Sequence, residues 1–143
     1  EKNKKEKINI LKDKIKLSLP QFADISLVTI SALKNKGLYK LKQAVVSAKE
    51  NWNKRFSTAK LNKWLSIKTA QHPPPMLKGK RLKLRYITQI KTRPPNFLIF
   101  SSSLDIPKNY RKFLINGLRD QFDLKNVPIR LGFRVGENPY VQN

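Results

Sequence analysis

The sequence predicts an α+β protein in two parts, and three observations support this. Apolar residues recur at helical spacing in four segments, strictly alternating residues predict strands, and proline or glycine separates these segments. Residues 57–136 are expected to form a sandwich in the order helix, strand, strand, helix, strand. Residues 1–52 are expected to form helix, strand, helix, which is part of an open α/β sheet, and residues 53–56 link the two parts.

The first part begins with an amphipathic helix that ends before Pro20. Its apolar positions are Ile8, Leu11, Ile15 and Leu19. The β-rich run from Asp24 to Ile30 predicts a buried strand, and a polar loop from Ser31 to Gly37 follows it. Apolar residues between Leu38 and Trp52 predict a long helix. Because a single strand cannot bury itself, we expect its neighbours in the sheet to lie upstream of Glu1.

The second part opens with a helix that Ser57 or Thr58 caps and that Pro73–Pro75 ends. Its predicted core positions are Leu61, Trp64 and Leu65. A β-hairpin is expected between Lys78 and Phe100, with a turn at residues 91–95. Strict alternation in its first strand places one set of side chains on each face: Arg81, Lys83 and Arg85 on one, Leu82, Leu84 and Tyr86 on the other.

The hairpin is followed by a helix and a final strand. Asp105 is expected to cap the helix, which has Pro107 in its first turn, and close packing of Gly117 against a strand would explain a glycine inside it. The predicted buried stripe of the helix is Tyr110, Phe113, Leu114, Leu118 and Phe122. In the last strand Ile129, Leu131, Phe133 and Val135 alternate with Arg130 and Arg134, and residues 137–143 form a polar tail.

Positive charge is the strongest signal in the composition. The chain has 31 Lys+Arg against 9 Asp+Glu, a net charge of +22. Between Asn51 and Leu104 there are twelve Lys or Arg and no acidic residue. Such an excess indicates a polyanionic partner, most often nucleic acid. A solvated lysine-rich surface is the alternative; it explains the lysines near the amino terminus but not the arginine-bearing strand.

The predicted sheet therefore has one apolar face, covered by helices, and one cationic face that is open to a partner. We expect the cations there and in the hairpin turn to contact phosphates, which gives affinity without sequence information. Tyr86 and Phe97 are expected in the core rather than stacked on bases. The candidate RNA-binding residues are Lys78, Lys80, Arg81, Lys83, Arg85, Arg93, Arg130 and Arg134.

Several kinds of chemistry are not supported by the sequence. There is no cysteine, no glycine-rich phosphate loop and no apolar run of about twenty residues, and the carboxylates are scattered. His72, the single histidine, is expected in a surface loop. No signal-peptide pattern is present, so a cytoplasmic protein without membrane contact is expected. We expect no catalytic residue, metal site or cofactor in this chain by itself.

Ser31, Ala32 and Leu33 follow the carboxyl end of the predicted strand. Ligands of open α/β sheets bind at that edge, although an ordinary strand-to-helix turn fits these three residues as well.

Many short blocks of the chain, in a fixed order, resemble one family. The blocks are Lys60–Lys63, His72–Pro75, Gly79–Tyr86, Thr88–Gln89, Pro94–Pro95, Tyr110–Leu114, Leu118–Arg119, Pro128–Leu131 and Gly136–Tyr140. They are similar to the carboxyl-terminal part of the bacterial GTPases called Der or EngA. Members have two tandem GTP-binding domains followed by a KH-like domain, and act in assembly of the large ribosomal subunit.

The resemblance implies that residues 1–52 are the last helix, strand and helix of the second GTPase domain. Ser31, Ala32 and Leu33 would then belong to its guanine-recognition loop, with the Ala32 N–H facing the guanine carbonyl. GTP is the cofactor implied for the intact parent protein. This chain lacks the family's phosphate-binding, magnesium-binding and Asn-Lys-x-Asp motifs, so alone it is expected neither to hydrolyse nor to hold GTP.

The chain departs from RNA-binding KH domains at one point. These domains clamp the RNA backbone with a Gly-x-x-Gly loop, whereas the connection Phe122–Asn126 has no glycine. The basic sheet face or hairpin turn is therefore the preferred contact for ribosomal RNA. The alternative is a regulatory docking domain that contacts the upstream GTPase domains and responds to nucleotide state.

Overall fold

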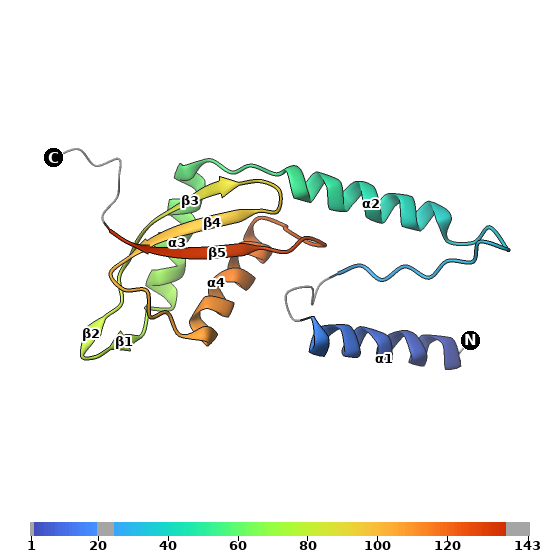
Figure 1. The fold of residues 1–143 in the computed structure, drawn as a ribbon, viewed down its shortest axis with the longest axis horizontal. Coiled ribbons are helices and arrows are strands. Elements are labelled where there is room, and N and C mark those ends of the chain that lie inside the picture. The colour runs from blue at the N-terminus through green and yellow to red at the C-terminus, as the bar shows by residue number, and fades with distance from the viewer. Residues whose placement is uncertain (1, 20–24, 137–143) are drawn as a thin grey trace.

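The computed structural model describes residues 2–19 and 25–136 (Figure 1). Its elements are α1 (Lys2–Ser18), α2 (Leu38–Asn53), α3 (Thr58–Gln71), β1 (Met76–Leu77), β2 (Lys80–Arg81), β3 (Leu84–Lys91), β4 (Asn96–Ser101), α4 (Lys108–Gln121) and β5 (Arg130–Val135). The predicted α+β class is confirmed, with helix, hairpin, helix and strand in the second part. Pro20, Asp24 and the predicted tail at 137–143 lie outside the described residues.

Strands β3, β4 and β5 form one sheet in that order, with β3 antiparallel and β5 parallel to β4. Helices α3 and α4 cover one face of it (Figure 1). Rows of partners on this inner face, such as Gln89–Phe97–Leu131, meet the helices in a core that includes Leu61, Trp64, Leu65, Leu114 and Leu118. The predicted core positions of α3 are therefore confirmed, and none of the helices in the described residues covers the opposite sheet face.

The first strand of the hairpin is interrupted, which differs from the prediction. β2 ends at Arg81 and pairs with β1 in a separate two-stranded sheet, and β3 begins at Leu84 with an irregular register before Tyr86. A bulge of this kind shifts the alternation by one residue. Tyr86 therefore lies on the outer face beside its partner Phe100, and its predicted place in the core is wrong.

Helices α3 and α4 pack through a glycine and a tryptophan. A Cβ atom on Gly117 would lie 3.1 Å from Cζ2 of Trp64, so the glycine permits close approach to a helix, not to a strand as predicted. Ser57 caps α3 by accepting a hydrogen bond from the Lys60 N–H. The predicted cap by Asp105 is wrong, because Pro107 is the N-cap residue of α4 and has no side chain that can accept a hydrogen bond.

The exposed His72 caps the end of α3 and contacts α4. Its ring lies 5.0 Å from the Phe113 ring, centroid to centroid, and its carbonyl oxygen accepts a hydrogen bond from the Tyr110 hydroxyl at 3.0 Å. Burial raises the pKa of Tyr110 above its ordinary value, so the hydroxyl is a protonated donor at neutral pH.

Two side-chain amides fasten β3 to the chain before it. The Asn62 amide donates to the Ile87 carbonyl at 2.9 Å and accepts from the Ile87 N–H at 3.0 Å. The buried Gln89 amide accepts from the Phe56 N–H at 2.9 Å and donates to the Lys54 carbonyl at 3.0 Å. Because β3 is an edge strand, these bonds satisfy backbone groups that have no neighbouring strand.

The strand predicted at residues 24–30 is not formed. Residues 25–30 have no regular secondary structure and are exposed or half-buried, with Ile25 and Ile30 exposing 43% and 50% of their surface. Within the described part of the chain no strand lies beside this segment, and an unpaired strand leaves its N–H and C=O groups without partners. Helices α1 and α2 on either side of it are formed as predicted.

Candidate nucleic-acid interface

A groove of about 810 Å³ opens where the β1–β2 hairpin meets the start of β3 and the loop after β4. Five of the predicted binding residues line it: Lys78, Lys80, Arg81, Lys83 and Arg85. All five are exposed. The tight turn of the hairpin, with positive φ at Lys78 and Gly79, brings the two short strands together and holds their lysines on one wall. The fold thus brings five of the eight predicted cations around one groove.

The opposite wall is the loop from Ser101 to Asp105. Backbone and hydroxyl groups join the two walls, because the Lys83 N–H donates to Ser102 Oγ at 2.9 Å and the Ser102 N–H donates to the Lys83 carbonyl at 2.9 Å. Ser103 Oγ accepts from the Asp105 N–H at 3.1 Å. These hydrogen bonds hold the loop after β4 against the chain between β2 and β3.

The other three predicted residues lie outside the groove. Arg134, Phe100 and Tyr86 form one row on the outer sheet face, and Arg130 lies in the row with Lys91 at the opposite end of the same face. Arg93 lies in the β3–β4 turn and its Nε donates to Asn53 Oδ1. All three are exposed. Arg93 and Arg130 lie at the end of the sheet with the β3–β4 turn, which is the end nearest α2 (Figure 1), whereas Arg134 lies toward the other end, nearer the groove.

Neither aromatic side chain considered for base stacking lines the groove. Phe97 is fully buried in the core, as expected. Tyr86 is half-buried on the outer sheet face, with its ring centroid 6.0 Å from that of Phe100.

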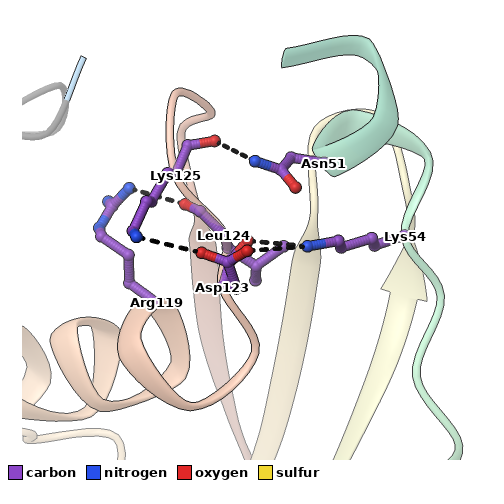
Figure 2. Close-up of polar contacts among 6 residues, drawn as sticks. All are labelled: Asn51, Lys54, Arg119, Asp123, Leu124 and Lys125. Carbon is purple, nitrogen blue, oxygen red and sulfur yellow. Dashed lines mark hydrogen bonds and ion pairs between the residues drawn. The ribbon is translucent and has the colours of Figure 1, made fainter. Parts of the chain in front are cut away.

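The loop after α4 contacts the end of α2. This is the connection that has no glycine, in contrast to the Gly-x-x-Gly loop of RNA-binding KH domains. Figure 2 shows the Asn51 amide donating to the Lys125 carbonyl at 2.8 Å and the Lys54 ammonium donating to the Asp123 carbonyl at 2.9 Å. The Ser26 N–H also donates to Asn126 Oδ1, at 2.6 Å. This loop is therefore engaged by the first part of the chain.

The buried Arg119 also stabilises this loop. One guanidinium nitrogen of Arg119 donates to the Leu124 carbonyl at 3.2 Å and to the Val127 carbonyl at 3.1 Å, and Figure 2 shows the first of these bonds. Arg119 is 7% exposed, so it acts on the loop and not on a partner.

The predicted guanine loop is an exposed turn. The backbones of Ser31 and Lys36 pair with each other at 2.9 and 3.0 Å, and Ser31 Oγ accepts from the Lys34 N–H at 3.3 Å. Leu33 at its tip exposes 95% of its surface. Gly37, with φ of 82°, precedes α2, and any Cβ there would meet the Thr29 carbonyl oxygen.

Among the described residues, no group of three or more His, Asp or Glu side chains is arranged to hold a metal ion. In the same residues no helix has the length and apolar composition needed to cross a membrane.

Comparison with known proteins decides the family. A sequence model described as the KH-domain-like, C-terminal part of EngA bacterial GTPase enzymes matches residues 55–134. This chain belongs to the EngA family. The matched range contains the three-stranded sheet, both covering helices and the groove.

Individual EngA relatives match nearly the whole chain. GTPase Der of Rhizobium meliloti is 48% identical over 131 residues, which is 91% of this chain and 28% of that protein. GTPase Der of Ruegeria pomeroyi is 48% identical over 143 residues, which is 98% of this chain and 29% of that protein. The chain therefore spans under a third of the length of these relatives.

Several residues that line the groove were not identified from the sequence. Ser102, Ser103 and Asp105 line the groove, but the sequence predicted only a helix cap for Asp105 and no role for the two serines. These residues line the groove because the chain returns toward β2 after β4. No local sequence pattern predicts that return. Asn62 and Gln89 lie within blocks shared with the family, and that likeness was the available signal for both.

Proposed function

We propose that this chain is the carboxyl-terminal part of a bacterial GTPase of the Der type and that its KH-like domain binds ribosomal RNA of the large subunit. The observation that carries the proposal is the gathering of five exposed cations around one groove, in a stretch of sequence with no acidic residue between Asn51 and Leu104. A surface of this kind attracts phosphates and releases their counterions.

The proposal extends to the parent protein. It would bind GTP through its upstream domains and act in the cytoplasm, and Ser31, Ala32 and Leu33 would contribute to guanine recognition with the Ala32 N–H facing the base. Support for this comes from the family and from the exposed turn at these residues. The upstream GTPase domains would also supply sheet neighbours for residues 25–30.

The test uses the parent GTPase and purified large ribosomal subunits. Changing Arg81, Lys83 and Arg85 to glutamate should remove association in a sedimentation assay, because the groove would then repel phosphate. The matched control changes Lys60, Lys63 and Lys112, three exposed cations of α3 and α4 outside the groove, to glutamate and should retain most association. Normal association of the groove variant would show that this surface does not bind the subunit.

A second candidate function is regulatory docking. It is favoured by the contacts of Ser26, Asn51 and Lys54 with the loop at 123–126, since Ser26 lies five residues before Ser31. A movement of the loop at Ser31–Leu33 would then be transmitted through these contacts to the KH-like domain. Replacing Asn51 with alanine and Lys54 with methionine in the parent protein should change its GTPase rate without RNA; an unchanged rate would exclude this role.

A further inference from the structure

The groove differs in one respect from the surfaces with which proteins read bases. None of the side chains that line it is aromatic; beside the five cations it offers the leucines Leu77 and Leu82 and the loop residues Ser102, Ser103 and Asp105. Stacking on aromatic rings and hydrogen bonds to base edges are the usual means of reading single-stranded RNA. The groove therefore has the groups for binding phosphates and offers no aromatic ring for stacking bases.

The hydroxyls on the loop wall add donors for an anion. Ser102 Oγ and Ser103 Oγ each accept a backbone N–H, from Lys83 and Asp105 respectively. A serine hydroxyl carries one O–H in addition to its two acceptor sites, so each O–H remains available to donate to a phosphate oxygen. Two arginines, Arg81 and Arg85, supply planar guanidinium groups that match phosphate oxygens in pairs.

One lining side chain opposes phosphate. Asp105 is the carboxylate on the loop wall, and it is the first acidic residue after the acid-free stretch that ends at Leu104. It is exposed, and no ion pair with a groove cation is recorded for it among the described residues. Its charge lowers the attraction of the groove for any anion that reaches this wall.

We propose that this groove binds the sugar–phosphate backbone of RNA without regard to base sequence, and that Asp105 limits the affinity. This proposal rests on the proposed function. The groove would bind consecutive phosphates of one RNA strand, with the bases directed away from its walls. An acidic peptide is the competing polyanion, and because its carboxylates also accept paired hydrogen bonds from arginine, the experiment includes polyglutamate as a competitor.

The experiment measures binding of the full 143-residue chain to labelled oligo-U, oligo-A and oligo-C of equal length at low salt. The three affinities should agree within about threefold. Lys80→Glu with Arg81→Glu should lose at least about tenfold, and Asp105→Asn should gain about two- to fivefold. The control pair Lys60→Glu with Lys63→Glu carries the same change of charge on α3 and should lose much less. Thermal unfolding of each variant verifies that it is folded.

The outcomes separate the two proposals. If the wild-type chain binds none of the RNAs, the proposed function fails. If it binds RNA but the Lys80/Arg81 variant binds equally well, or Asp105→Asn does not gain, the groove assignment fails while RNA binding stands. A preference above about tenfold for one homopolymer, or equal competition by polyglutamate, would also overturn the inference.

Discussion

At the scale of single residues, buried and half-buried polar side chains complete the hydrogen bonding of the backbone. Asn62, Gln89 and Arg119 each join a backbone segment that no strand or helix completes. A buried donor or acceptor left without a partner costs about 1–3 kcal/mol, so each of these side chains has a large effect if removed.

Replacing Asn62 with leucine should lower the free energy of unfolding by about 2–4 kcal/mol, because the N–H and C=O of the fully buried Ile87 both lose their partner. Denaturant unfolding measures the change. Lys63→Ala, one position along the same helix and exposed, is the control and should stay within about 0.5 kcal/mol of the wild type. Equal stability of the leucine variant would contradict the role given to the amide.

Replacing Arg119 with methionine should destabilise the chain by about 2–4 kcal/mol, since the charged donor serves two buried carbonyls. Hydrogen exchange should also become faster in the loop that follows α4. Arg119→Lys keeps the charge but not the planar fork of donors, so it should recover only part of the stability. Full recovery by lysine would indicate that charge alone matters here.

At the scale of elements, the contact of α3 with α4 fixes how both helices cover the sheet. Gly117→Val should cost about 1–3 kcal/mol, because a Cβ already lies 3.1 Å from the Trp64 ring and the added methyl groups have no space. Urea unfolding of this variant is compared with that of Asn116→Ala, an exposed neighbour on α4 for which no loss is expected. A stable valine variant would show that the helices can separate without cost.

Local patterns predicted most elements because periodicity and capping are local. The stripe of Leu61, Trp64 and Leu65 and the cap at Ser57 are examples. Non-local features were missed: the bulge that turns Tyr86 outward depends on pairing with β4, and the groove wall at Ser102 depends on the chain returning to Lys83. The strand predicted at 24–30 failed for the same reason, since a strand requires a neighbour and none lies beside it in the described residues.

At the scale of the whole molecule, charge and shape agree on where an RNA would lie. The sheet face away from α3 and α4 carries Arg130 and Arg134. The β1–β2 hairpin, which borders the groove, lies away from α2 (Figure 1). The eight predicted cations do not form one continuous surface, because Arg93 and Arg130 lie at the other end of the sheet, near the β3–β4 turn. Five of the eight line the groove.

Binding of RNA should weaken steeply with salt. If the five groove cations each neutralise a phosphate, the logarithm of the association constant should fall with a slope of about −3.5 against the logarithm of salt concentration, at about 0.7 per phosphate for single strands. Fluorescence anisotropy over a salt series measures this slope, and it should become shallower in the Lys80/Arg81 variant. A slope near zero would mean that phosphates contribute little.

The most direct test of the account is crosslinking of the parent GTPase to large ribosomal subunits, with the crosslinked residues mapped. We expect crosslinks to RNA on the β1–β2 hairpin and on the loop from Ser101 to Asp105. Crosslinks confined to the outer surfaces of α3 and α4, with the groove untouched, would contradict the central claim that this basic groove is the RNA-binding surface.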